Sequence, residues 1–278
     1  MLSNLGLGLF RFIQILIRLG MVSLCRRISL SLGYVFMYAN RKNYNNGIER
    51  INKLIGVKSS QISGIITRKV FTNFLLTLIE NAGIPQLLKS RPVTNIEFKN
   101  LQYLEKLYKE NKGVVIATVH TGNWEYSGAA LAGRGYKVNA VAWSANNSFI
   151  ENEYQKMREL SGVKIIRPDE NAPIKILRCL RKGECVVFVI DIGEWGPDLE
   201  GEIAGNSFYF PQGPFRIAKQ LGLPILPVVN YRKKLDELCI EFMEPVSAED
   251  MNISVKDFCS RVEPIVYRYP DQWIISLS

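Results

Sequence analysis

From Val114 onward, short apolar runs alternate with segments of helical periodicity, and this alternation restricts the possible folds more than any other feature. The apolar runs are Val114–Val119, Val138–Trp143, Val163–Ile166, Val186–Ile190 and Ile225–Val229. Between them lie the helical patterns Trp124–Ala132, Phe149–Leu160, Ile174–Arg181 and Pro214–Leu221. Strands that alternate with helices predict an α/β fold, in which a central mixed but mostly parallel sheet is flanked by helices.

The remaining segments fit one domain preceded by a membrane-associated segment. Helical patterns cover Asn43–Ile55, Ser60–Ala82, Leu101–Asn111 and Val255–Tyr267, and Cys239–Met243 predicts an antiparallel edge strand. No linker rich in Pro, Gly or Ser divides the chain, and 278 residues with 47% hydrophobic side chains can form a large core. We therefore expect a segment 1–42 followed by a single domain 43–278.

The positive charge lies almost entirely near the N-terminus. Residues 1–79 contain eleven Lys and Arg and one acidic residue, Glu49, whereas the rest contains 24 basic and 25 acidic residues. Such a bias indicates a polyanionic partner: nucleic acid, anionic lipid or an acidic protein. Because zinc-finger spacing, RNA-binding aromatic signatures and Lys/Arg runs are all missing from the sequence, we expect no nucleic acid partner.

The first basic residues interrupt an apolar stretch, Leu5–Cys25, that is long enough to cross a bilayer. About thirteen apolar residues favour insertion by roughly 6 kcal/mol, and two arginines, Arg11 and Arg18, oppose it by about 5 to 7 kcal/mol. The seven-residue spacing places both arginines on one helical face. The stretch, together with Ile28–Tyr38, therefore predicts amphipathic helices that lie on an anionic membrane surface; helices packed on the protein's own core are the alternative.

Several kinds of chemistry are not supported by the motifs of this chain. The five cysteines are scattered and include no C-x-x-C pair, which indicates a reducing compartment without a disulfide framework. One histidine and dispersed thiols do not predict a zinc site. The sequence contains no P-loop, no dinucleotide-binding fingerprint after a strand and no G-x-S-x-G elbow. We expect neither a metal nor a cofactor.

The one histidine, His120, directly follows the apolar run VVIATV and opens the turn HTGNWE. In α/β sheets, chemistry gathers where strands end and helices begin. Glu125 lies five residues further on, and we expect its carboxylate to fold back behind the imidazole, leaving the other ring nitrogen as a base. Without an enzyme nucleophile, such a pair fits direct activation of a substrate hydroxyl; an ordinary core or surface histidine is the alternative.

The block VVIATVHTGNWE resembles the H-x4-[DE] motif of the membrane glycerolipid acyltransferase superfamily, and it is most similar to the late acyltransferases of lipid A biosynthesis. The resemblance extends over roughly residues 40 to 275, through NSFIENEYQKMRELSG, VVFVID, GNSFYFPQGPFRIAKQLGLPILPV and YPDQWII. It implies that domain 43–278 is an acyltransferase domain. It also implies secondary acylation of a saccharide lipid, from an acyl carrier protein or coenzyme A thioester, at the cytoplasmic face of the bacterial inner membrane.

The resemblance implies catalytic roles for His120 and Glu125 and substrate-binding roles for Arg158 and Asp191. For Asn123 two roles stay open, holding the turn or binding a substrate phosphate. Arg158 and the backbone N–H groups after Gly122 are candidate donors to an oxyanion. The alternatives are a surface ion pair for Arg158 and a helix or turn cap for Asp191. The aromatic residues Phe208, Tyr209, Phe210 and Phe215 are candidates for an acyl groove or for ordinary core.

The acceptor is left open by a departure from the family pattern. The chain reads DIGEWG, with one aspartate before Gly193, where the family commonly has D-x-D-x-G, and the loop Glu194–Gly205 is acidic. A phospholipid or glycolipid acyltransferase in a bacterium without lipid A is therefore an equally compatible reading. An acyl-lipid hydrolase and a catalytically silent lipid-binding protein are further alternatives.

Overall fold

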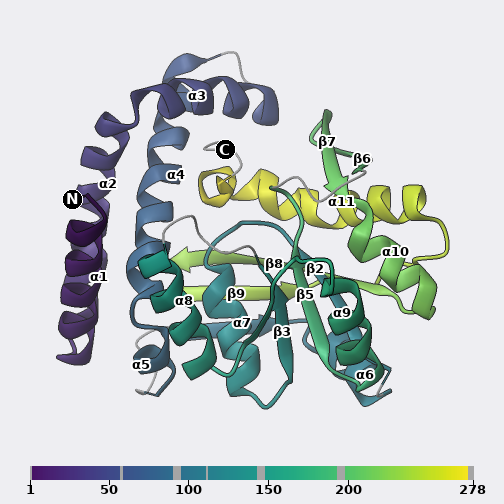
Figure 1. Ribbon diagram of the computed structural model, residues 1–278. Coiled ribbons are helices and arrows are strands. Elements are labelled where there is room, and N and C mark those ends of the chain that lie inside the picture. The colour runs from purple at the N-terminus through teal and green to yellow at the C-terminus, as the bar shows by residue number, and fades with distance from the viewer. Residues whose placement is uncertain are drawn as a thin grey trace.

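A computed structural model describes residues 2–56, 59–89, 95–110, 112–142, 148–192 and 198–274. Its main element is a seven-stranded sheet in the order β1-β9-β8-β2-β5-β3-β4, with a separate two-stranded hairpin, β6-β7 (Figure 1). The strands are β1 (Asn95–Lys99), β2 (Val114–Thr118), β3 (Val138–Val141), β4 (Lys164–Ile166), β5 (Cys185–Val189), β6 (Asp198–Ile203), β7 (Asn206–Pro211), β8 (Ile225–Lys234) and β9 (Glu237–Phe242). The predicted mixed, mostly parallel sheet is confirmed, since among the described strands of this sheet β8 and β9 pair antiparallel and the other neighbours pair parallel.

Helices cover both faces of the sheet, because the strands bury alternate side chains on opposite sides. In β2, Val115 and Ala117 join one core with α9 (Ala172–Arg181), α10 (Gln212–Leu221) and α11 (Met251–Arg268). Val114 and Ile116 join the other core with α5 (Ile84–Lys89), α6 (Gln102–Lys109), α7 (Trp124–Gly133) and α8 (Ser148–Leu160). The alternation of strands and helices predicted from Val114 onward is therefore correct.

Two expectations about the sheet are wrong. The strand predicted at Cys239–Met243 is β9, which pairs antiparallel with β8 but does not form the edge, because β1 pairs parallel on its far side. The acidic stretch expected to be a loop contains most of the β6-β7 hairpin, whose turn residues Ala204 and Gly205 have φ of 52° and 72°. Side chains of β6 alternate between exposed and buried, which is a strand pattern.

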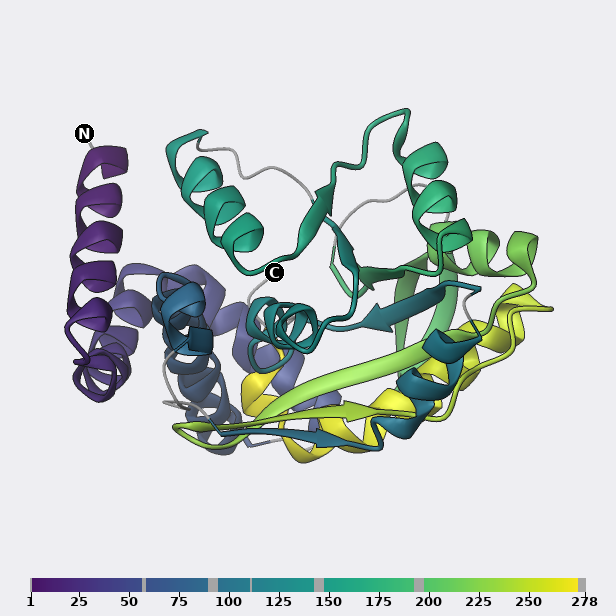
Figure 2. The ribbon, with the colours of Figure 1, turned by 90° about the horizontal axis from the view of Figure 1, so that it is seen from below.

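The N-terminal helices are α1 (Leu2–Arg18), α2 (Val22–Ala39), α3 (Arg41–Ile55) and α4 (Ser60–Asn81). The expectation of one helix over Leu5–Cys25 is wrong because Gly20, with φ of 78°, separates α1 from α2. Helix α2 packs along α4, and Met37, Tyr44 and Phe71 form a small core among α2, α3 and α4. Figure 2 shows α1 at the periphery, beside α2 and away from the sheet.

The outer surface of α1 and α2 is unusually apolar. Large hydrophobic side chains are exposed at Phe12, Ile15, Leu19, Met21, Leu24, Ile28, Leu30, Leu32, Tyr34, Val35 and Tyr38. Arg11 and Arg18 are exposed on the same helix as the first of these. Several large apolar side chains exposed on neighbouring helices are typical of an interaction surface. The other sides of these helices pack on the protein, since Ile17, Val22 and Cys25 are buried in one of its cores and α2 packs along α4. The alternative of helices packed on the protein's own core therefore describes that side.

By length and composition, one helix among the described residues, α4, could cross a membrane. Its window is 44% buried inside the protein, and the helix packs against α2, α3 and the short 3-10 helix η1 (Pro270–Gln272). The proposed division at residue 42 stays a prediction. The structure adds that α2 is tied to the rest of the chain by a buried ion pair between Arg26 and Glu80.

Candidate active site

The register of two neighbouring parallel strands brings His120 and Asp191 together. Thr118, the last residue of β2, pairs with Val189, the last residue of β5. His120 and Asp191 each lie two residues beyond this pair, at the carboxyl edge of the sheet. The predicted location of His120 at a strand end is confirmed, and Asp191 is the acidic residue beside it.

Asp191 binds His120 through both carboxylate oxygens. Its Oδ1 lies 2.6 Å from His120 Nδ1, and its Oδ2 accepts a hydrogen bond of 2.9 Å from the His120 backbone N–H. The indole Nε1–H of the fully buried Trp273 donates to Oδ2 at 2.7 Å. Asp191 is itself buried, so its carboxylate has one fixed orientation behind the imidazole. Sequence reasoning placed Asp191 at the substrate and gave no role to Trp273.

Glu125 does not orient the imidazole, contrary to the prediction. It lies in the first turn of α7, and its carboxylate forms a two-pronged ion pair with Arg158 from the last turn of α8. Arg158 Nε donates to Glu125 Oε2 at 2.9 Å, and Nη2 donates to Oε1. The pair is largely buried, which differs from the surface ion pair that was the alternative for Arg158.

Asn123 stabilises the turn between His120 and α7 through two side-chain hydrogen bonds. Its side-chain oxygen caps α7 by accepting from Tyr126 N–H at 2.9 Å, and its Nδ2–H donates to Glu80 at 3.0 Å. Asn123 is completely buried, so the structure supports the turn-holding role among the two that the sequence left open. Gly122 has φ of 55°, and a β-carbon there would lie 2.8 Å from atoms of Asn230. The turn therefore requires glycine.

His120 lies in the lining of a cavity of about 340 Å³. The cavity wall includes Trp124, Glu125 and Arg158, so the structure gathers most of the predicted site residues around one space. Trp124 packs edge-on against the imidazole with ring centroids 4.9 Å apart. The His120 side chain is 21% exposed, which leaves the ring accessible from the cavity.

A second cavity of about 330 Å³ adjoins the first, since Val141 and Val189 line both. Its wall is largely apolar and comes from β3, β5, α9 and α10; it includes Ile176, Phe188, Ile190, Gly213, Pro214 and Ile217. The aromatic residues predicted as an acyl groove do not form this wall. Phe210 and Phe215 are buried in the core, Phe208 packs on Trp273, and Tyr209 is exposed.

The predicted features Asn111, Trp143, Asn147, Gly193 and Glu194 lie outside the described residues.

Comparison with known proteins gives two findings. The sequence model of a family described as bacterial lipid A biosynthesis acyltransferase matches residues 3–276. Two curated relatives, from Mycobacterium tuberculosis strains CDC 1551 / Oshkosh and ATCC 25618 / H37Rv, are 25% identical to this chain over 130 residues. Both carry the name phosphatidylinositol mannoside acyltransferase, and the match spans 46% of this chain and 41% of each relative.

Proposed function

The chain belongs to the bacterial lipid A biosynthesis acyltransferase family, and we propose that it is a membrane-associated acyltransferase that moves a fatty acyl group from a thioester to a lipid hydroxyl. The observation that carries the proposal is the His120–Asp191 pair, whose histidine lines a cavity, with no enzyme nucleophile in the motifs of the chain. A base without a nucleophile of its own suits a reaction in which the second substrate attacks directly.

His120 is the proposed general base. An ionised carboxylate only accepts hydrogen bonds, so the ring nitrogen beside Asp191, Nδ1, carries the hydrogen and Nε2 keeps its lone pair. Nε2 removes the proton from the acceptor hydroxyl as the oxygen attacks the thioester carbonyl. Asp191 stabilises the imidazolium that forms, as the acid of a Ser-His-Asp triad does.

The second half of the reaction uses the proton that Nε2 took from the acceptor hydroxyl. When the tetrahedral intermediate collapses, the carbon–sulfur bond breaks and the imidazolium protonates the departing thiolate, which regenerates neutral His120. We place the oxyanion of the intermediate at the N-terminal end of α7. The first backbone N–H groups of a helix have no hydrogen-bond partner within the helix and can donate to an anion there. Arg158 and Glu125 line the same cavity as a neutral ion pair and contact the bound substrate there.

The apolar cavity beside the site is the proposed place of the acyl chain. It is largely apolar, it shares Val141 and Val189 with the His120 cavity, and a hydrocarbon chain gains about 0.8 kcal/mol for each buried methylene. A thioester carbonyl near His120 would therefore direct its acyl chain between α9 and α10.

Filling this cavity should shorten the acyl chain that the protein accepts. A β-carbon on Gly213 has no atom within 4 Å, so Gly213→Leu starts a side chain at the cavity wall in open space. We expect the preferred acyl length to fall by about two to four carbons, measured by competition among acyl thioesters of different length. Gly133→Leu, equally open and exposed on α7 outside both cavities, is the control. An unchanged length profile for Gly213→Leu would place the chain elsewhere.

The proposed membrane surface is the exposed apolar side of α1 and α2 with its arginines. Apolar side chains at this surface enter the lipid interface while the cations meet lipid phosphates. Docking of this kind would place the enzyme at the bilayer surface, where the hydroxyl of a lipid acceptor lies. We propose docking at the cytoplasmic face, where acyl thioesters are made.

Reversing the charge of two arginines tests this docking. Arg11→Glu together with Arg18→Glu should lower the affinity for phosphatidylglycerol-containing vesicles by at least about 30-fold, measured by sedimentation, since each basic residue near an anionic surface contributes about 1 kcal/mol. Arg178→Glu with Arg181→Glu, on exposed positions of α9 at the opposite side of the molecule from α1, is the matched control (Figure 1). Equal sedimentation of both double variants would contradict the proposed surface.

The acceptor proposed is a hydroxyl of a glycolipid, as in the secondary acylation of a lipid A-like saccharide, and the donor is an acyl carrier protein or coenzyme A thioester. The family description and the name of the mycobacterial relatives both support a sugar-containing lipid. A lysophospholipid-type acceptor is the second candidate, because every group named at the site would serve it equally. Thioester turnover with and without each acceptor separates the two, and turnover without any acceptor would indicate a hydrolase.

A further inference from the structure

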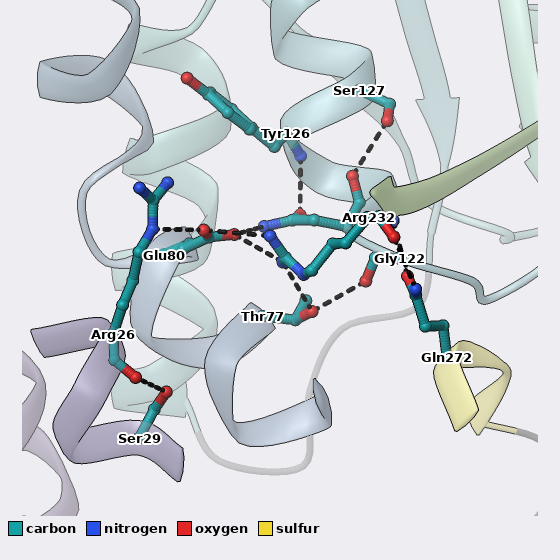
Figure 3. Close-up of polar contacts among 10 residues, drawn as sticks. Arg26, Ser29, Thr77, Glu80, Gly122, Tyr126, Ser127, Arg232 and Gln272 are labelled. Carbon is teal, nitrogen blue, oxygen red and sulfur yellow. Dashed lines mark hydrogen bonds and ion pairs between the residues drawn. The ribbon is translucent and has the colours of Figure 1, made fainter. Parts of the chain in front are cut away.

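A buried carboxylate, Glu80, lies at the C-terminal end of α4 behind the His120 turn (Figure 3). Its Oε1 accepts from Arg26 Nε at 2.9 Å and from Arg232 Nη1 at 3.1 Å. Its Oε2 accepts from Arg232 Nη2 at 2.6 Å and from Asn123 Nδ2 at 3.0 Å. One carboxylate thus joins α2, β8 and the turn before α7, and it uses both of its oxygens to do so.

The first connection from Glu80 to His120 runs through the turn. Glu80 fixes Asn123, and Asn123 caps α7. Thr77, one helical turn before Glu80, donates its hydroxyl to the Gly122 carbonyl at 2.8 Å. Two residues of α4 therefore hold the two residues that precede Trp124, and the same turn begins at His120.

The second connection runs through β8 to the residue behind Asp191. Glu80 holds the Arg232 side chain, while the Arg232 backbone exchanges two hydrogen bonds with the side chain of Gln272, of 2.7 and 2.9 Å. The next residue, Trp273, donates to Asp191. The Ile274 backbone N–H also donates to the His120 carbonyl at 3.1 Å. Both sides of the His120–Asp191 pair are thus supported by elements that Glu80 binds.

The charge of Glu80 is part of this arrangement. Burial by itself raises the pKa of Glu80, but the attraction of Arg232 and Arg26 and the hydrogen bonds from Arg232 and Asn123 outweigh burial, and the pKa lies below its ordinary value. The group is therefore an anion between two guanidinium groups. Only an anion can accept all four hydrogen bonds at once, because a neutral amide of the same shape would present donors to donors.

We infer that Glu80 is a positioning residue for His120, which fixes the catalytic turn and the Trp273 support of Asp191 and connects both to the proposed membrane-docking helix α2. The inference rests on the proposed function for its activity measurement. If Glu80 served stability alone, its replacement would lower the fraction of folded protein but would leave the geometry of the active site in the folded protein unchanged.

Two variants separate positioning from stability. Glu80→Gln removes the charge and turns an amide toward Asn123 or Arg232. Asn123→Ser keeps an oxygen that can cap α7 but is too short to reach Glu80, and it leaves both arginine pairs in place. For each folded variant we expect kcat to fall about 10- to 100-fold with KM within about threefold of wild type, because misplaced catalytic groups lose rate rather than binding.

Glu184→Gln is the matched control. Glu184 is a buried carboxylate that accepts from Asn139 at 2.9 Å, and it precedes β5, at the opposite end of that strand from Asp191. We expect this variant to keep wild-type kcat even if its melting temperature falls. A loss of kcat in Glu184→Gln equal to that in Glu80→Gln would overturn the inference.

A second readout needs no turnover. His120 is the only histidine in the chain, so protein labelled with ¹⁵N-histidine gives imidazole signals from this ring alone. We expect Glu80→Gln and Asn123→Ser to shift or broaden these signals, and Glu184→Gln to leave them as in wild type. Wild-type imidazole signals in both Glu80→Gln and Asn123→Ser would refute positioning by Glu80. If the wild-type protein transferred no acyl group, the proposed function would fail, and this comparison would still decide the inference.

Discussion

Replacing His120 by alanine is expected to lower kcat for acyl transfer by about 10²- to 10⁴-fold, the usual contribution of a general base. The acceptor hydroxyl would then have to attack without a group to take its proton, whereas the two cavities proposed to bind the substrates keep most of their walls. KM for the thioester should therefore stay within a few-fold of wild type. The measurement is transfer of radiolabelled acyl groups from thioester to lipid acceptor, with initial rates at saturating substrate.

His120→Ala should also leave the fold intact, because the imidazole is partly exposed and belongs to neither hydrophobic core. Circular dichroism and the melting temperature check this point. Tyr267→Ala, an exposed aromatic position on α11, is the control for a surface truncation. Transfer at the wild-type rate by folded His120→Ala protein would remove the proposed base and with it the mechanism.

A still more discriminating result is expected from the two acidic residues near His120. Asp191→Asn keeps the shape of the side chain but cannot stabilise an imidazolium or fix the Nδ1–H tautomer, and we expect kcat to fall about 10²- to 10⁴-fold. Glu125→Gln weakens the pair with Arg158 on the cavity wall and leaves the imidazole partner in place. We expect its main effect on KM, with kcat reduced less than about tenfold.

These two variants are matched in chemistry, since each replaces a carboxylate by its amide. Rates and KM values are compared for the same thioester and acceptor, with melting temperatures to confirm folding. The opposite order, with Glu125→Gln losing far more kcat than Asp191→Asn, would restore the pairing expected from the five-residue spacing and refute the pairing in the structure.

Much of the fold follows from the period of apolar residues along the chain. Four of the five apolar runs between Val114 and Val229 form interior strands, where side chains on both faces of the sheet are buried and mostly apolar, as in β2. The fifth run, Val163–Ile166, forms the edge strand β4. The short strand β1 and the hairpin β6-β7 were missed, because they are half-exposed and carry Glu97, Glu200 and Glu202 among their apolar residues. Charge obscured their two-residue alternation.

The strand-end positions of His120 and Asp191 followed from the sequence, but the contact between the two side chains did not. His120 and Asp191 were both expected at strand ends, yet which strands adjoin depends on the order of the sheet, where β5 enters between β2 and β3. Local spacing favoured Glu125 because it lies near in sequence, whereas the partner lies 71 residues away. Glu80 belongs to no motif, and Trp273, although it lies in the block YPDQWII, was given no role. A long-range hydrogen-bond network of this kind is visible only once the fold has brought α2, α4, β8 and the C-terminal residues together.

In the proposed mechanism, Asp191 accepts a hydrogen bond from Nδ1–H of His120 and so fixes the tautomer in which Nε2 is the base. Nitrogen-15 NMR of protein labelled in its single histidine measures this directly in wild type, Asp191→Asn and Glu125→Gln. The structure predicts a strongly deshielded, exchange-protected Nδ1–H signal in wild type and Glu125→Gln and its loss in Asp191→Asn. A signal that survives in Asp191→Asn and disappears in Glu125→Gln would contradict the account.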